Sequence, residues 1–306
     1  MFLRLPERLT FSVLMGSWAP VAEEPALWNE MAPPYSPLPP VELTCYTADK
    51  KETPMNRPII IVITAASLDG RVALGPDRTQ WDELDDPRNQ EPYGGGGAWE
   101  DAVRRIEQIH SPDAEMQGSG SFVPEGTELQ PLPPFEGDPE TLHRDFLPEE
   151  VVERPDLEKW LVVVDGRGRM RSGYKGDEES GAHVIHLTAH GAPDEYLAFL
   201  RREGIPYLIA GERWVDLPEV MRRMKEKLGV ETLLSMAGGR LNGALLRAGL
   251  IDEVNVLFTP RLIGGTDTPT LYQSPDLADD EWPTPLALIS AEVRADGVLW
   301  LRYEVA

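Results

Sequence analysis

The order of apolar and polar residues along the chain predicts alternating strands and helices from residue 57 onward. The unbroken β-branched run IIIVI inside RPIIIVITAASLDG (57–70) is typical of a buried strand. AWEDAVRRIEQIH (98–110) instead repeats its apolar residues at helical spacing, with Val103 and Ile106 on one face. Further strands are predicted at 159–166, 182–188, 205–211, 230–236 and 251–260, and further helices at 192–203, 217–228 and 239–249.

The C-terminal part and the connections complete this pattern. ALISAEVRADGVLWLRYEV (287–305) predicts a hairpin whose turn lies at 295–297. Residues 71–97 are polar and glycine-rich and predict a loop, whereas residues 117–156 predict a long irregular connection, either functional or flexible. Alternating strands and helices predict an α/β fold with a mainly parallel sheet, to which the hairpin adds antiparallel strands at an edge.

The first part of the chain differs in composition. It carries many prolines, including the stretch PPYSPLPP at 33–40, which favours an extended arm with little regular structure. We therefore expect a Pro-rich N-terminal extension over residues 1–56, followed by one α/β domain over residues 57–306. The sequence shows no clear boundary for a second folded domain.

Charge and cysteine content exclude several classes of protein. The 306 residues include 52 acidic and 29 basic side chains, and a formal charge of −23 repels nucleic acid and anionic membrane surfaces. The single cysteine, Cys45, excludes an intrachain disulfide and a cysteine-rich zinc site. No apolar run approaches the length of a membrane span, and the first residues lack the apolar core of a signal peptide. We expect a cytoplasmic protein that acts on a small molecule and contacts neither nucleic acid nor membrane.

A strand and a helix meet at two glycines in SMAGGRLNGALL (235–246). Such a junction leaves free backbone N–H groups at a helix start, where the helix dipole also favours an anion. Gly238 and Gly239 have no Cβ, so that a phosphate can approach the backbone closely. The alternative is a tight turn that needs glycine for its dihedral angles alone.

A second glycine cluster, QGSGSF (117–122), follows a short predicted strand at 113–117. Ligands of open α/β sheets lie beyond the carboxyl ends of strands, so two such turns are suited to hold a dinucleotide between them. Neither turn has the GxGxxG pattern, and an ordinary dinucleotide-binding Rossmann domain is therefore not predicted.

Other candidate chemistry is weaker. Three histidines, at 183, 186 and 190, suggest a metal site, but His183 and His186 lie three residues apart on a predicted strand and therefore face opposite sides of the sheet. We therefore predict no metal site. Ser235 precedes a glycine turn, yet no histidine lies in a context typical of a catalytic triad, so hydrolysis is not predicted.

Four stretches occur in the order found in one known family: ASLDGR (66–71), DAEMQGSGSF (113–122), VVVDGRGRM (162–170) and MAGGRLNGALLRAGLIDEVNVLFTPRLIGG (236–265). Together they resemble the reductase domain of the riboflavin-pathway pyrimidine deaminase-reductases, over roughly residues 57–304. The preceding residues carry no deaminase signature, since they contain neither His-x-Glu nor paired cysteines. The resemblance implies a dihydrofolate-reductase-like fold, in which helices flank a mainly parallel sheet.

The resemblance further implies an NADPH-dependent reductase of a ribosylamino-pyrimidine phosphate or of a related pterin- or pyrimidine-like heterocycle. The reaction is hydride transfer to a C=N or C=O carbon, in which the cofactor carries the difficult step. The cofactor-binding residues implied are Gly118, Ser119, Gly120 and Ser121 after the second strand, Gly238, Gly239, Arg240 and Leu241 at the helix start, and Asp165, Arg167 and Thr188 at the adenosine end. Arg167, Arg169 and Arg240 are candidates to meet a 2′-phosphate.

On the substrate side, Ser67 and Asp69 match the family motif and are the catalytic residues that the resemblance implies. For Asp69, a role as a simple turn cap is an equal alternative. Arg88 has the spacing of a residue that binds the substrate phosphate, which a guanidinium can hold with two hydrogen bonds. A solvated loop arginine is the alternative for Arg88.

The sequence departs from the family on this same side. Ile63 stands where some members have lysine, and Met236 stands at a substrate-binding position where the family has an acidic residue. Methionine cannot accept hydrogen bonds from sugar hydroxyls as a carboxylate does. The stretch PEGTE (124–128) replaces the usual loop sequence, and Glu125 or Glu128 is a candidate to replace the missing acid.

We therefore expect a retained cofactor pocket beside an altered substrate site. The alternative function is a homologue that binds the cofactor without catalysis, or a scaffold that uses the Pro-rich extension. The resemblance also implies a homodimer, for which the C-terminal hairpin and the extension are candidate interface segments.

Overall fold

The computed structural model describes residues 56–76, 78, 97–177, 181–294 and 297–306. All of them belong to one folded unit that comprises residues 50–306. Most of the predicted extension, residues 77 and 79–96 of the predicted loop at 71–97, and the hairpin turn residues 295–296 lie outside the described residues.

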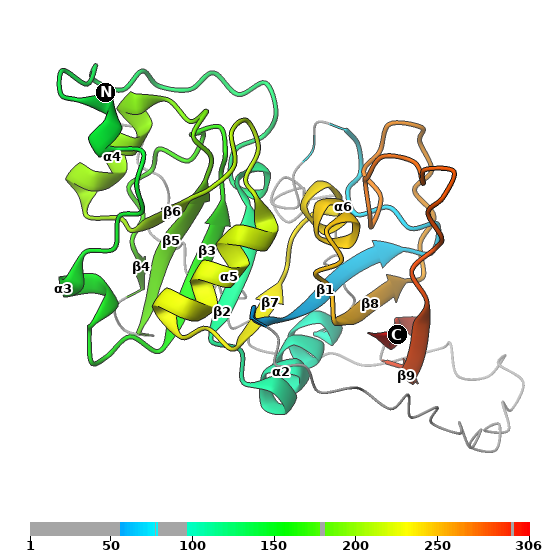
Figure 1. The fold of residues 1–306 in the computed structure, drawn as a ribbon. Helices are drawn as coiled ribbons and strands as arrows, with labels where there is room; N and C mark the ends of the chain where they lie inside the picture. Colours follow the sequence, from blue (N-terminus) through cyan, green and yellow to red (C-terminus); the bar gives the residue numbers. More distant parts are fainter. Residues whose placement is uncertain (1–55, 77, 79–96, 178–180, 295–296) are drawn as a thin grey trace, which may run out of the picture. The chain divides into compact units, whose positions relative to one another are not determined.

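The described residues form a ten-stranded mixed sheet (Figure 1). Nine strands follow one another in the order β4-β5-β3-β2-β7-β1-β8-β10-β9, and β6 pairs with β5. Pairing is parallel from β6 through β5, β3, β2, β7 and β1 to β8, and antiparallel between β4 and β5, between β8 and β10, and in the hairpin β9–β10. The strands are β1 Ile59–Ser67, β2 Ala114–Gly118, β3 Lys159–Val164, β4 Gly176–Asp177, β5 Ala182–Thr188, β6 Tyr207–Ile209, β7 Thr232–Ser235, β8 Glu253–Thr259, β9 Leu286–Val293 and β10 Leu299–Val305. The predicted mainly parallel α/β fold with a C-terminal antiparallel hairpin is confirmed.

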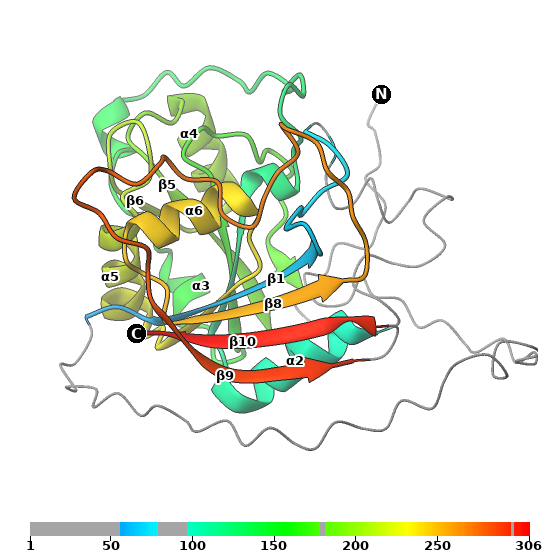
Figure 2. The same cartoon turned by 90° about the vertical axis from the view of Figure 1, so that its right-hand side faces the viewer.

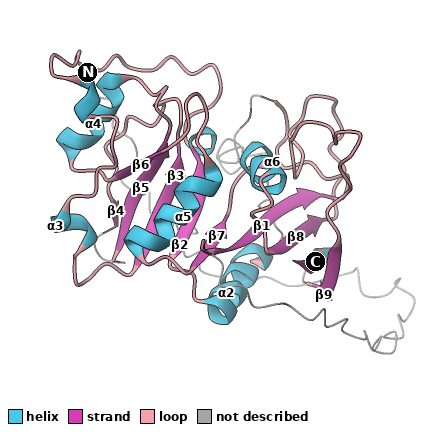
Figure 3. Cartoon of the chain, viewed as in Figure 1, coloured by secondary structure: helices cyan, strands magenta, loops and turns pink. Residues whose placement is uncertain are grey.

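Figure 3 shows the helices in cyan, and all but one of those described follow predicted amphipathic segments. The α-helices are α2 Ala98–His110, α3 Glu149–Val152, α4 Asp194–Glu203, α5 Leu217–Leu228 and α6 Gly239–Arg247. Both α4 and α5 end where a glycine takes the left-handed conformation, at Gly204 with φ 69° and at Gly229 with φ 68°. A residue with a Cβ is strained there, so glycine stops both helices. The short α3 and the two-residue strand β4 lie in or beside segments that the sequence pattern left irregular.

Helices cover both faces of the sheet. Alternate residues of β1 point to opposite sides: Ile60 and Val62 pack with α5 and α6, whereas Ile61 and Ile63 pack with α2. Figure 2 shows α6 on one side of β1 and β8 and α2 on the other. Helix α4 shares the α2 side, because its Tyr196 bonds a residue of β5 that faces away from the α5 core.

The strand order creates a change of direction between β2 and β7. The chain passes from β1 to β2 and adds β3 and β5 outward, then returns to insert β7 between β2 and β1, and continues to β8 on the far side of β1. The connections that leave β2 and β7 therefore run in opposite directions along the sheet. Open α/β sheets bind ligands in the crevice beyond the carboxyl ends of two such strands.

The long connection after β2 is anchored at its far end to the opposite part of the sheet. Phe146 forms a β-bridge with Tyr207 of β6, and the Tyr207 hydroxyl donates to the carbonyl of Leu142 at 2.5 Å. Asp145 accepts the N–H of Ile209 at 3.0 Å and pairs with Arg223 of α5. This half of the connection contacts β6, whereas its earlier part reaches the turn after β3 through the ion pair of Glu125 with Arg167.

Candidate active site at the strand ends

The turns after β2 and β7 lie side by side. The two strands pair in register, with Met116 opposite Ser235, and the N–H of Met236 donates to the carbonyl of Met116 at 3.0 Å. Just beyond, a Cβ placed on Gly118 would lie 3.8 Å from Cδ2 of Leu241. The two glycine clusters that the sequence singled out are therefore neighbours at the point where the connections diverge.

The turn after β2 forms a single turn of 3-10 helix over Ser119–Ser121. Gly118 has an extended conformation, with φ −86° and ψ 152°, and Gly120 is exposed with no heavy atom within 4 Å of a Cβ placed on it. Ser119 is buried and Ser121 is half-buried. Gly120 therefore borders open space, whereas Ser119 packs inward.

The start of α6 is uncapped. Gly238 is the N-cap residue and brings no side chain, and the first turn contains no acidic residue. A Cβ on Gly238 would meet nothing within 4 Å, and Gly238 is exposed. The N–H groups of a first helical turn have no partner within the helix, and together with the dipole they attract an anion. At Gly238 the helix start therefore offers an anion both open space and a partial positive charge.

Gly239, the second glycine of the pair, has a different reason to be glycine. A Cβ there would lie 1.9 Å from the carbonyl oxygen of Thr270, and one on Gly243, a turn later, 2.2 Å from that of Gln273. The N–H of Gln273 also donates to the carbonyl of Gly239 at 2.8 Å. Gly239 is therefore buried against the protein's own backbone, whereas Gly238 faces open space, and phosphate binding by the backbone of both glycines stays a prediction.

A buried asparagine that sequence reasoning missed fixes this helix start. Nδ2 of Asn242 donates to Oγ1 of Thr64 on β1 at 3.1 Å and to the carbonyl of Ala237 at 2.9 Å. Its Oδ1 accepts from the hydroxyl of Ser235 at 3.3 Å. Asn242 is fully buried, and its amide joins α6 to β1 and to the end of β7. Only its place one turn into a helix beside the glycines gave a sequence signal.

The turn after β3 is held from within. Asp165 is 1% exposed, and its Oδ2 accepts the N–H groups of Arg169 at 2.7 Å and Met170 at 2.8 Å. It also accepts the hydroxyl of Tyr196 at 3.0 Å. Thr188 is fully buried, and its hydroxyl donates to the carbonyl of Asp165 at 3.0 Å. Asp165 and Thr188 thus shape the turn that presents Arg167, and a direct contact of either with a cofactor stays a prediction.

Behind this turn, Tyr196 links Asp165 to His186. Because the tyrosine hydroxyl donates to Asp165, it accepts from Nδ1 of His186 at 2.8 Å, which places a proton on Nδ1. Burial lowers the pKa of His186 to about 4 and raises the pKa of Tyr196 well above its usual value. Both rings therefore stay uncharged at neutral pH.

Three arginines gather around one glutamate beyond these turns. Arg167 binds Glu125 with two hydrogen bonds of 3.0 Å, and Arg240 at the start of α6 reaches the same carboxylate at 3.2 Å. Arg169 lies 3.4 Å from it. The hydrogen bonds from Arg167 are the main cause that lowers the pKa of Glu125 to about 2. The cluster thus joins the connections that leave β2, β3 and β7.

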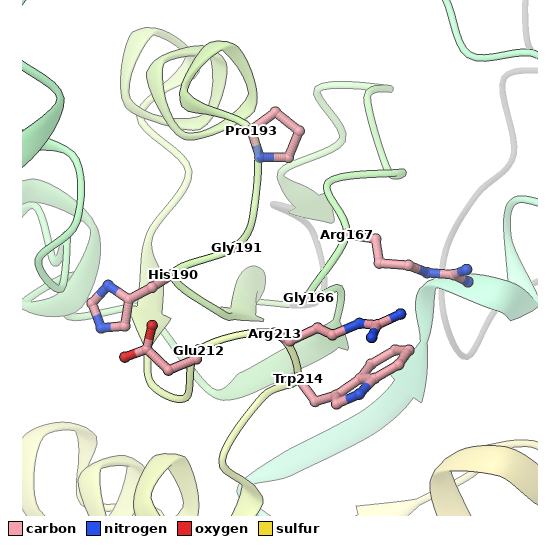
Figure 4. A pocket seen from close by; sticks show the side chains of 8 residues that line it. All are labelled: Gly166, Arg167, His190, Gly191, Pro193, Glu212, Arg213 and Trp214. Atoms are coloured by element: carbon pink, nitrogen blue, oxygen red, sulfur yellow. The ribbon is translucent and has the colours of Figure 1, made fainter.

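A pocket of about 540 Å³ adjoins this cluster at the ends of β3, β5 and β6 (Figure 4). Arg167, Arg213 and Trp214 gather on one side of it, and His190 and Glu212 lie on the other. The guanidinium of Arg213 lies 5.4 Å from the centre of the Trp214 ring, and Trp214 is 63% exposed. Sequence reasoning missed Arg213 and Trp214, because they follow the three-residue strand β6 in no motif.

Ser67 and Asp69, the candidate catalytic pair, anchor a loop. Ser67 is fully buried, and its hydroxyl donates to Oδ1 of Asp69 at 2.6 Å. Asp69 also accepts the N–H groups of Ile263 at 3.0 Å and Gly264 at 2.6 Å. The hydrogen bond from Ser67, followed by these two, lowers the pKa of Asp69 to about 2, so the carboxyl is not a proton donor at neutral pH. Their contacts support the turn alternative, and a catalytic role for them stays a prediction.

Of the other substrate-side positions, two lie at the α2-side core and one lies outside the described residues. Met236 is half-buried against the α2-side core, directly after β7. Ile63 is fully buried in that same core, so its replacement of lysine fills a packed site. Arg88 lies outside the described residues, and its role stays a prediction.

Two classes of site are absent from the described ranges. His183 packs against Trp160 and His186 against Tyr196, on opposite faces of the sheet as the spacing predicts. No three His, Cys, Asp or Glu side chains in the described part of the chain are grouped to hold a metal ion. Among the helices that the structure describes, none has the length and apolar character needed to cross a bilayer.

Known proteins of similar sequence are pyrimidinone phosphate reductases by name. The 2,5-diamino-6-ribosylamino-4(3H)-pyrimidinone 5′-phosphate reductase of Methanothermobacter thermautotrophicus is 28% identical over 216 residues, which are 70% of this chain and 83% of the relative. The enzyme of that name from Archaeoglobus fulgidus is 26% identical over 218 residues, 70% of this chain and 86% of the relative.

Solved structures show the same fold. A pyrimidine reductase-like protein from Corynebacterium diphtheriae superposes with a TM-score of 0.56 at 15% identity, covering 82% of this chain and 93% of the other. RibD of Acinetobacter baumannii gives a TM-score of 0.53 at 19% identity, covering 82% of this chain and 59% of the other.

The four stretches on which the resemblance depends all lie within one matched region. The family model described as the RibD C-terminal domain matches residues 58–300, from the start of β1 into β10. That region includes the paired glycine turns, the Asp165 turn and the Ser67–Asp69 anchor. The chain belongs to the RibD C-terminal domain family.

Proposed function

We propose that this chain is an NADPH-dependent reductase of a ribosylamino-pyrimidinone 5′-phosphate, the substrate named for its relatives. One observation carries the proposal: two glycine turns lie side by side where the connections after β2 and β7 diverge. An open backbone at such a point suits the diphosphate of a dinucleotide. Family membership makes a riboflavin-pathway substrate the first choice.

The residues along the strand ends fit such a cofactor. The uncapped α6 start at Gly238 and the open turn at Gly120 are suited to the diphosphate. Arg167 and Arg213 offer guanidinium groups to a 2′-phosphate, and Trp214 offers an exposed ring to an adenine. When bound, NADPH supplies the hydride, and the chain positions the two reactants and excludes water.

On the substrate side, Ser67 and Asp69 are proposed as positioning residues. Their hydrogen bonds hold the loop at 263–264 against the end of β1. The segment at 269–273 links this region to the start of α6, because the N–H of Gln273 donates to the carbonyl of Gly239. Arg88 remains the proposed partner of the substrate phosphate. Hydride transfer to the carbon of a C=N or C=O bond requires a proton on the nitrogen or oxygen. Since Asp69 is ionised, this proton is proposed to come from water.

Reductase activity is tested by the oxidation of NADPH in the presence of the pyrimidinone phosphate, with Gly238→Asp and Gly238→Ala as matched variants. Because Gly238 borders open space, both variants should fold. The carboxylate of the Asp variant opposes a phosphate, and we expect at least a tenfold loss of NADPH affinity, about 1.4 kcal/mol. The Ala variant should stay close to wild type. Equal affinity in the two variants would contradict the site.

A second function is a homologue that binds the cofactor without turnover. It is favoured by the commitment of Ser67 and Asp69 to a loop anchor and by the methionine at 236. It requires NADPH binding with no oxidation for any pyrimidinone phosphate. Measured turnover with the pathway substrate would eliminate it. For a scaffold role, deletion of residues 1–50 should abolish partner binding and leave the pocket intact.

We propose further that the protein is a cytoplasmic homodimer with the hairpin in its interface. The outer strand β9 exposes Leu286, Ile289 and Val293, at 46%, 38% and 81% of their surface. Exposed apolar residues on a strand that ends the sheet among the described residues are suited to a partner chain. Sedimentation of Val293→Lys against wild type tests this, since a dimer at this edge should dissociate.

A further inference from the structure

Glu125 is the shared counter-ion of two exposed arginines. Its carboxylate accepts two hydrogen bonds from Arg167 and one from Arg240, whose side chains are 45% and 75% exposed. Within the described residues, Glu125 is the acidic partner of both. Each guanidinium belongs to a turn that borders the dinucleotide region, after β3 and after β7. The carboxylate of Glu125 therefore connects the turn after β3 with the turn after β7, and the proposed function depends on both turns.

The loop that carries Glu125 does not need this carboxylate to keep its place. The nearly buried Arg169 donates to the carbonyl oxygens of Val123 at 2.6 Å and Pro124 at 2.5 Å. Thr127 closes the following turn, with its hydroxyl 2.7 Å from the carbonyl of Pro124. The backbone on either side of Glu125 is thus fixed by main-chain contacts, and its side chain is left to pair with the exposed arginines.

The charges around Glu125 are unbalanced in favour of an anion. Three guanidinium groups face one carboxylate in a chain whose formal charge is −23. Arg167 holds Glu125 through two parallel hydrogen bonds, the geometry in which arginine also binds a phosphate. A phosphate carries more oxygens and more charge than a carboxylate and satisfies both arginines better.

We propose that Glu125 occupies a phosphate subsite formed by Arg167 and Arg240, and that a ligand phosphate displaces its carboxylate. This inference rests on the proposed function for the ligand, because the phosphate is taken to belong to the dinucleotide. Glu125 then acts as an internal competitor that weakens the binding of anionic phosphate ligands. A neutral group cannot displace it, so Glu125 keeps the arginines paired until a phosphate arrives.

The test compares wild type, Glu125→Gln and the control Glu136→Gln, which removes an exposed acid elsewhere on the same connection. Calorimetry measures the affinity of each protein for NADPH, NADH and inorganic pyrophosphate. Exposed arginine–carboxylate pairs each contribute up to about 1 kcal/mol, so we expect Glu125→Gln to bind phosphate ligands about three- to tenfold more tightly. Raised salt should shrink this difference, because the groups are exposed. Glu136→Gln should match wild type.

The arms distinguish the source of the phosphate. If Glu125→Gln binds NADPH more tightly than wild type does but not NADH, the subsite holds the 2′-phosphate. If it binds both dinucleotides more tightly to the same extent, the subsite holds the diphosphate. Both results support the proposal. Unchanged or weaker binding of all three ligands by Glu125→Gln overturns it, and weaker binding would make Glu125 a direct ligand. If no dinucleotide binds to any variant, the proposed function fails, and pyrophosphate still decides the subsite.

A second measurement shows that the variant is folded. Glu125→Gln should unfold at a slightly lower temperature than wild type without ligand, because it loses the negative charge that pairs with the arginines and one of its two acceptor oxygens. With saturating pyrophosphate, the same variant should gain more in unfolding temperature than wild type does. An equal gain in both proteins would also overturn the proposal.

Discussion

The two glycines at the start of α6 give the sharpest test of the physical account, because adjacent identical residues have opposite surroundings. A Cβ on Gly239 would lie 1.9 Å from the carbonyl oxygen of Thr270, whereas one on Gly238 would meet nothing within 4 Å. Neither glycine has a positive φ, so space alone separates them. We therefore expect Gly239→Ala to destabilise the fold and Gly238→Ala to leave it nearly unchanged.

The expected magnitude follows from these contacts. Forcing a methyl group into packed surroundings costs about 1–3 kcal/mol, and the shift also weakens the bond from Gln273 to the carbonyl of Gly239, worth about 1 kcal/mol. Gly239→Ala should therefore lose about 2–4 kcal/mol of unfolding free energy. For a domain of this size that lowers Tm by roughly 5–15 °C. Gly238→Ala changes an N-cap residue and should cost less than about 1 kcal/mol.

Urea unfolding measures both values, with NADPH binding as a second readout. Gly239→Ala should lower the unfolding midpoint without a change in the slope, which reports surface exposed on unfolding. Equal stability of the two variants would refute the reasoning. Loss of NADPH binding by a fully stable Gly239→Ala would show instead that this glycine serves the ligand, as the sequence alone suggested.

Three further outcomes follow from buried and paired groups. Asp69→Asn should lower Tm at neutral pH; because folding lowers the carboxyl pKa from 3.8 to about 2, the stabilisation is complete above pH 3.8 and is lost as pH falls through about 2, so the Tm values of the two proteins should converge there. A Tm gap that persists at pH 2 would contradict this. Tyr196→Phe removes a hydroxyl that donates to buried Asp165 and should cost about 1–3 kcal/mol in urea unfolding; a neutral effect would argue against the network. Lys159→Met leaves Glu115, whose side chain is 2% exposed, without its cation and should cost about 3–5 kcal/mol, far more than Glu115→Gln; similar losses would contradict the pairing.

Local sequence signals predicted most of the elements. The predicted bounds of α2, α5 and β5 agree with the structure to the residue. Their apolar patterns lie within the segments, and a glycine directly beside each segment marks one of its ends. Strand–helix alternation likewise gave the mainly parallel sheet. The two-residue strand β4 has no such periodicity and was not predicted.

The candidate site was predicted less completely, because its contacts join distant parts of the chain. Sequence reasoning found both glycine turns and Arg167. It could not show that Thr270 packs on Gly239, since 31 positions separate them, or that Asn242 joins α6 to β1. Trp214 follows a short strand in no motif, and its exposure became visible only when the strand ends were brought together.

The central claim is that the backbone at Gly238 and Gly120 binds the diphosphate of a reduced nicotinamide nucleotide. A crystal structure of the complex with NADPH measures this directly. The account predicts diphosphate oxygens within hydrogen-bonding distance of the N–H groups that open α6, with the adenosine end towards Arg167 and Trp214. A dinucleotide bound elsewhere, with the α6 start in contact only with solvent, would contradict it.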